Sequence, residues 1–218
     1  HLPPACPPGR APVPMPPEPD SSTIQHLDPL SWDRLVESLG PASCVVVIDG
    51  WIGRDLARVV AAEDIWQEAL FLAWRDREQH AWRGVRAYRG WLLEIARNRV
   101  RDHARRASAL KRGGGDKPAL FSEMGLEEGA TLGSLLPAGS TTPSRVAHTN
   151  EQAARMRAAL AELPDEQADV LRRHLFEERE MTDVAEELGI GLSAAWYRFR
   201  AGSEAYAQVL TRLEGGAG

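Results

Sequence analysis

A dense run of cations between residues 97 and 112 gives this sequence its clearest capacity for ionic binding. Seven arginines and lysines stand there beside a single acid, so the segment has a charge of +6 although the whole chain has −5. Arginines recur every fourth residue from Arg97 to Arg105 and would form one ridge along a helix. With Tyr88 and Trp91 just before it, such a ridge suits phosphate contacts and stacking on an unpaired base. A solvated charged face is the alternative interpretation.

A second candidate binding element lies between Met181 and Tyr206. The apolar spacing predicts a helix-turn-helix with its turn at Gly189 and with these residues directed inward: Val184, Ala185, Leu188, Leu192, Ala195 and Phe199. The residues left to meet base edges and phosphates are Ser193, Ala194, Trp196, Tyr197, Arg198 and Arg200. A plain helical hairpin is the alternative, and the two aromatic residues could pack instead. Two arginines are few for a DNA reader, because cations dominate nucleic-acid affinity.

The apolar periodicity predicts an all-α fold of two small helical domains joined by a flexible linker. The first domain is expected over residues 29–109, with helices near 30–39, 56–75 and 87–109. Acids at the start of the second of these helices favour its dipole. The β-branched run Cys44 to Ile48 could form a strand, but no second strand is available to pair with it. We therefore expect it to be a buried helical segment.

The second domain is expected over residues 151–214 and begins near Asn150. Its helices are predicted to start at Pro164 as a first helical residue, after Thr182 as an N-cap, and at Leu192. Residues 110–150 are rich in glycine, proline and serine and predict a mildly acidic linker. Residues 1–28 hold nine of the 15 prolines within their first 20 positions and predict a disordered arm.

Several function classes are disfavoured by what the sequence lacks. The scattered histidines form no paired metal motif, and no phosphate loop or nucleophile elbow is present, so we expect neither an enzyme nor a cofactor or small-molecule substrate. Cys6 and Cys44 do not make a disulfide framework, and a free buried thiol is expected at Cys44. No apolar stretch is long enough to span a membrane, and no secretion signal is apparent. A cytoplasmic protein is predicted.

Three ordered runs of the chain resemble extracytoplasmic-function sigma factors, which belong to the sigma-70 family. The first run is Ala62-Glu63-Asp64-Ile65-Trp66-Gln67-Glu68, followed by Phe71-Leu72-Ala73-Trp74. The second is Trp91-Leu92-Leu93-Glu94-Ile95-Ala96-Arg97-Asn98, followed by Arg101-Asp102-His103 and Arg105-Arg106. The third comprises Leu160-Ala161-Glu162-Leu163-Pro164 and Val184-Ala185-Glu186-Glu187-Leu188-Gly189-Ile190. Three matches in order are more specific than any one of them alone.

The resemblance implies a sigma factor that directs core RNA polymerase to promoters and melts the DNA there. The polymerase would be contacted by Asp64, Gln67 and Glu68. The −10 promoter element would be contacted by Arg97, Asn98, Arg101, Asp102, Arg105 and Arg106, and the −35 element by the outward residues of the last helix. The first half would thus be sigma region 2 and the second half sigma region 4. An anti-sigma factor or another regulator is a further candidate partner.

One departure from the family pattern falls in the last helix. The family continues there with further basic residues, whereas this chain has Ala201, Gly202 and Ser203. Glycine inside a helix costs up to ~1 kcal/mol relative to alanine. Recognition of the −35 element is therefore expected to be weak, or to depend on shape more than on charge. A DNA-binding regulator that does not join polymerase remains the alternative function, although it leaves the first two runs unexplained.

Overall fold

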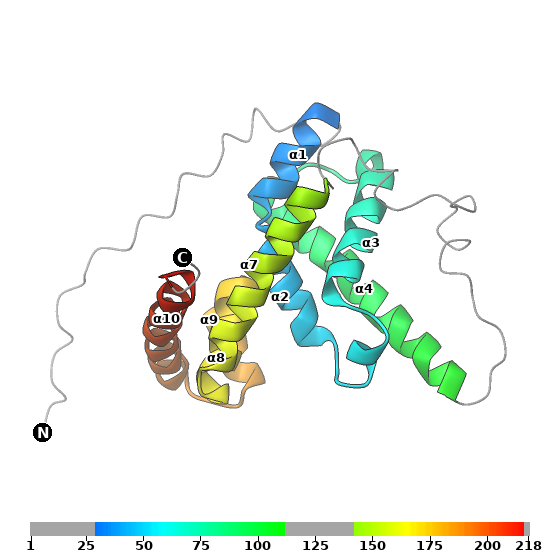
Figure 1. Ribbon diagram of the computed structural model, residues 1–218. Helices are drawn as coiled ribbons and strands as arrows, with labels where there is room; N and C mark the ends of the chain where they lie inside the picture. Colours follow the sequence, from blue (N-terminus) through cyan, green and yellow to red (C-terminus); the bar gives the residue numbers. More distant parts are fainter. Residues whose placement is uncertain (1–28, 112–141, 216–218) are drawn as a thin grey trace, which may run out of the picture.

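The computed structural model describes residues 29–111 and 142–215, and all regular secondary structure within these ranges is helical (Figure 1). The all-α prediction is confirmed. The first half contains α1 (Pro29–Ser38), α2 (Pro41–Trp51), α3 (Ala62–Arg75) and α4 (Val85–Lys111), with 3-10 turns η1 (Leu56–Arg58) and η2 (Arg77–Gln79). The second half contains α7 (Pro143–Ala161), α8 (Asp165–Leu171), the π-helical segment η3 (Arg172–Phe176), α9 (Met181–Glu187) and α10 (Leu192–Gly215).

Helix α2 is the most apolar element and lies at the centre of the protein. Its β-branched run from Cys44 to Ile48 is helical and fully covered, as expected, and Cys44 is a free buried cysteine. Gly40 permits the sharp entry from α1 because it adopts a φ of 65°, which residues with a Cβ rarely adopt. Pro41 then occupies the first turn of α2, where its missing N–H leaves no backbone hydrogen bond unmade.

Four predicted element boundaries are wrong. The helix expected from Leu56 is interrupted, since α3 begins only at Ala62 after the short turn η1 and an extended Ala61. Helix α7 begins at Pro143, inside the expected linker. Pro164 is the N-cap of α8 and not its first residue. Helix α9 begins before Thr182, whose hydroxyl donates only to the side chain of Asp183 at 3.5 Å. The predicted arm, residues 1–28, lies outside the described residues.

The two halves share one continuous apolar core. This core includes Trp32, Val47, Ile65, Tyr88 and Leu92 from the first half and Ala153, Ala159, Leu171, Phe176 and Tyr206 from the second. Figure 1 shows α7 lying across α2, with the upper end of α7 between α1 and α3. A second, smaller core fills the space between α8, α9 and α10, around Val170, Val184 and Ala195. The expected separate domains are therefore packed against each other.

The turn between α9 and α10 contains two glycines that form a matched pair for testing backbone strain. Gly189 has a φ of 63°, as predicted for a left-handed turn, whereas the φ of Gly191 lies outside that region. A Cβ added at either position meets no other atom within 4 Å. Only the backbone conformation therefore distinguishes the two sites.

We expect Gly189→Ala to lower the free energy of unfolding by about 1 kcal/mol, because an L-residue is strained in the left-handed region. Gly191→Ala serves as the control and should change stability by less than about 0.5 kcal/mol. Thermal or urea unfolding monitored by circular dichroism measures both effects. Equal stability of the two variants would contradict a strained Gly189.

Candidate nucleic-acid and polymerase interfaces

The predicted cationic ridge exists on the exposed side of α4. Arg97, Asn98, Arg101 and Arg105 are all exposed, and the side chain of Arg105 is 77% accessible. Arg101 donates from Nη1 to Oδ1 of Asn98 at 3.1 Å, which places the amide within the ridge. The ridge thus combines guanidinium groups with an amide that still has its N–H donors. This set suits phosphate oxygens and base edges.

Asp102 and Arg106 are less accessible than the other predicted −10 residues. Both are only partly exposed. Asp102 accepts a hydrogen bond from Nη1 of Arg99 at 3.2 Å and also pairs with Arg105 one turn along the helix. The carboxylate therefore orients two arginines of α4. A direct DNA contact by Asp102 would have to break these pairs.

Glu68 is the buried anchor that holds α4 against α3. Only 4% of its side chain is accessible. Its carboxylate accepts a hydrogen bond from Nε of Arg99 at 2.8 Å and lies 3.1 Å from Nε2 of His103. Burial alone would raise the pKa of Glu68, but the hydrogen bonds from His103 and Arg99 outweigh burial and hold this pKa below its ordinary range. In this position the carboxylate of Glu68 is not accessible to another protein, whereas the prediction placed it in contact with core RNA polymerase.

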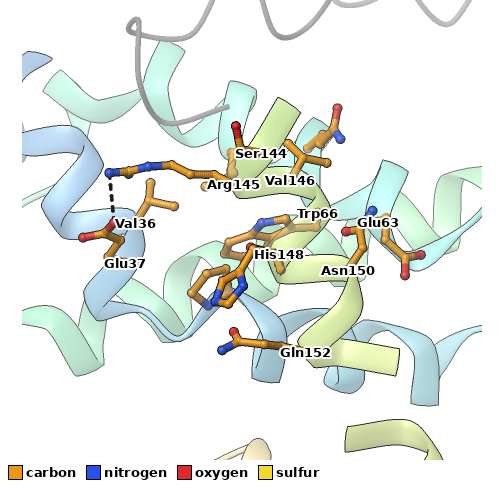
Figure 2. Close-up of a pocket in the computed structure, with 14 residues that line it drawn as sticks. Val36, Glu37, Glu63, Trp66, Ser144, Arg145, Val146, His148, Asn150 and Gln152 are labelled. Carbon is orange, nitrogen blue, oxygen red and sulfur yellow. Dashed lines mark ion pairs between the residues drawn. The ribbon is translucent and has the colours of Figure 1, made fainter. Parts of the chain in front are cut away.

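The other two predicted polymerase contacts, Asp64 and Gln67, differ in how far α3 exposes them. Asp64 is exposed to solvent, whereas Gln67 is half-buried and faces α7. Gln67 and Trp66 line a cavity of about 400 Å³ between α3 and the first turns of α7. Figure 2 shows Trp66 in the wall of this cavity, with His148 and Asn150 approaching it from α7. The docking residues are therefore divided between an exposed surface and a covered one.

The residues predicted to face DNA from α10 are mostly exposed. Ser193, Ala194 and Arg200 are accessible, as are Trp196 at 46% and Tyr197 at 75%, while Ala195 is buried against α9. Arg198 is held by an ion pair with Glu166 at 2.6 Å. Leu192 is 45% exposed and does not pack inward as predicted. The exposed residues of α10 up to Arg200 thus include two aromatic side chains, Trp196 and Tyr197, and one exposed arginine, Arg200.

Gly202 has a packing role that the sequence did not reveal. A Cβ at this position would lie 3.2 Å from Cβ of Gln167 and 3.4 Å from the backbone oxygen of the same residue. These distances are shorter than most contacts that real Cβ atoms make. The glycine therefore allows α10 to approach α8 closely, which explains why no larger side chain stands there.

The comparison with known families finds a match within the first half. Residues 49–109 match the Sigma-70 region 2 family, which covers the end of α2 through α4. This segment is similar to sigma-70 region 2. The match supports a sigma-70 family sigma factor, and a region 2 domain implies contacts with core RNA polymerase and promoter DNA. No curated protein matches the chain.

Two further observations concern the described part of the chain. None of its helices is long and apolar enough to cross a membrane. Nor do these residues contain a group of three or more histidine, cysteine, aspartate or glutamate side chains placed to hold a metal ion.

The lowered pKa of Glu68 gives a pH-dependent stability with a defined sign. Because the native carboxyl has a lower pKa than the unfolded one, about 4.3, the native state binds fewer protons. Its contribution is complete above the unfolded pKa and is lost as pH falls through the native pKa.

We therefore expect Glu68→Gln to lower the free energy of unfolding at pH 7 by about 3 kcal/mol, the effect of breaking a buried ion pair. This deficit relative to wild type should shrink as pH falls below about 4. Urea unfolding of both proteins from pH 7 to pH 3 measures it. Glu78→Gln removes an exposed carboxyl as a control. A deficit that is independent of pH would show that Glu68 acts through packing alone.

Proposed function

We propose that the protein is an alternative sigma factor of the extracytoplasmic-function type, which acts in the cytoplasm and has no catalytic activity of its own. The observation that supports this most strongly is the ridge of Arg97, Asn98, Arg101 and Arg105. It lies exposed on α4, inside the segment that matches region 2. The buried Glu68 pair fixes the rotation of α4 against α3 and hence the direction of the ridge.

In this proposal the ridge engages the −10 element while the strands separate. Extruding a base costs a few kcal/mol of stacking, so several groups must converge on the unpaired strand. Exposed guanidinium groups supply the phosphate contacts, and the amide of Asn98 supplies a group that can hydrogen-bond to a base edge. Trp91 of α4 is half-buried and stacks on His80, with 4.1 Å between the ring centroids. This stacking stabilises the part of α4 that precedes the ridge.

The second half is proposed to be a region 4-like helix-turn-helix that reads the −35 element. Support comes from the two packed helices α9 and α10, joined at the left-handed Gly189, and from the exposed face around Tyr197. With Arg198 paired to Glu166, phosphate attraction on this face is weak. Promoter choice is then expected to depend on the −10 contacts more than on the −35 contacts.

The decisive test of this function is binding to core RNA polymerase. We expect the purified chain to co-elute with core polymerase at low salt and to confer transcription from a subset of promoters in a reconstituted run-off assay. A regulator that does not join polymerase would bind DNA without co-eluting, so absence of co-elution would favour that alternative. Mapping the transcript starts would identify the promoter class.

Substitutions on α4 and on α3 separate DNA melting from polymerase docking. Arg105→Ala and Asn98→Ala should each reduce open-complex formation by about tenfold, which corresponds to roughly 1.4 kcal/mol, while leaving core affinity unchanged. Asp64→Lys should do the reverse, since it changes an exposed acid on α3 that is predicted to meet polymerase. Permanganate footprinting reports melting, and co-elution reports docking. Arg34→Ala, an exposed arginine on α1, is the control. Equal loss of both activities in every variant would refute these assignments.

A further inference from the structure

The face of α2 and α3 next to Gln67 is occupied by α7 of the same chain. Arg157 of α7 pairs with Glu63 of α3 at 2.8 Å and lies 3.8 Å from Asp49 of α2. Its guanidinium is only partly accessible, and it meets two acids from two helices of region 2. Glu63 and Asp49 therefore form an acidic site that binds a cation from a helix packed beside them. In this structure the cation is Arg157 of α7.

Small side chains let α7 approach this face closely. Ala153 and Ala159 of α7 are completely buried, and Met156 and Leu160 pack beside them against the core. The apolar contact lies along α2, while Arg157 supplies the ion pairs at its edge. An amphipathic helix with one cation therefore fits this surface.

The beginning of α7 is held less tightly than its middle. Arg145 pairs with Glu37 of α1 at 3.0 Å, and between this pair and Trp66 lies the cavity of about 400 Å³ (Figure 2). Gln67 lines the same cavity. The first turns of α7 thus cover the predicted docking residue without filling the space over it.

A second set of contacts closes the other end of the interface. Arg89 of α4 is buried, and it donates to the backbone oxygen of Phe176 at 2.6 Å and pairs with Glu178 at 3.1 Å. Arg86 pairs with Glu178 as well, at 3.3 Å. Glu178 has a φ of 55°, a strained value for a residue with a side chain. The contact therefore holds a strained residue next to the π-helical segment η3.

From these contacts we propose that α7 and core RNA polymerase compete for the face formed by α2 and α3, so that the free protein is closed and polymerase binding displaces α7. The inference rests on the proposed sigma function. The partner is defined chemically: its docking element presents a cation to Glu63 and Asp49 and apolar side chains to Trp66. Arg97 lies over the ring of Trp51 at 5.1 Å within the first half, and in the closed form both residues line a small polar cavity together with Arg172 and Arg173 of the second half.

The first arm of the test measures closure without polymerase. Fluorescent labels at Ala104 of α4 and Ala207 of α10, both exposed, report the distance between the halves by energy transfer. Cys6 is replaced by serine, and Cys44 is retained because it is buried. Arg157→Glu places like charges opposite Glu63 and Asp49, so we expect a population with longer distances. Arg155→Glu is the matched control, because among the described residues the ion pair of Arg155 lies within α7, with Glu151.

The second arm measures affinity for core polymerase. The apparent affinity for core is proportional to the fraction of molecules in the open form. Arg157→Glu should therefore bind core about tenfold more tightly than wild type, and Arg155→Glu should not. Arg145→Glu should act in the same direction as Arg157→Glu. Adding Glu37→Arg to Arg145→Glu restores the pair with reversed charges and should restore wild-type affinity. Circular dichroism confirms that each variant is folded.

The outcomes separate this inference from the function on which it rests. Longer distances together with tighter core binding support competition. Unchanged distances in folded Arg157→Glu and Arg145→Glu overturn it, as does opening without any gain in core affinity. If no variant binds core, while the distances still respond to Arg157→Glu, the proposed sigma function fails although the closed form stands.

Discussion

The structure depends on the need to cover α2 on every side. Val45, Val47 and Ile48 are inaccessible, and Val46 and Ala42 are nearly so, which means that this helix is apolar around most of its circumference. Helices of this kind are stable only when neighbours enclose them. The other helices of the first half cover part of α2, and α7 and η3 of the second half also pack against it. The shared core of the two halves follows from this requirement.

The second constraint is the buried carboxylate of Glu68. A buried charge is tolerated only when partners satisfy it, and Arg99 and His103 do so from the adjacent helix. The pairing fixes which side of α4 faces α3, and the opposite side then carries Arg101 and Arg105 into solvent. A single internal acid thus determines where the external cations point.

How much of this could be predicted is clear from particular residues. The helical fold, the buried Cys44 run, the exposed ridge and the left-handed Gly189 follow from periodicity, propensity and local charge. The burial of Glu68 did not follow from the sequence: Asp64, Gln67 and Glu68 share one face of α3, and it is the packing of α4, through Arg99 and His103, that covers Glu68 and leaves Asp64 exposed. The prediction that Leu192 points inward is wrong because this residue lies in the first turn of α10, beyond the small core.

The packing of the two halves could not be predicted at all from local patterns. It depends on pairs far apart in sequence, such as Arg157 with Glu63 and Arg89 with Glu178, and no periodicity reports them. Glu63 stood within the acidic run, but nothing marked its partner. Gly50 is a further residue whose role depends on the other half of the protein. A Cβ at this position would lie 2.9 Å from Cδ of Arg172.

Covering α2 with α7 also determines how the protein can open. Removing α7 without replacement exposes the apolar face of α2 to water at roughly 25 cal/mol per Å². Spontaneous opening is therefore disfavoured, and a partner that supplies its own apolar surface and a cation for Glu63 offsets most of this cost. The same contacts that stabilise the closed protein thus define the partner able to open it. A cationic surface lacking apolar side chains could pair with Glu63 and still leave α2 uncovered.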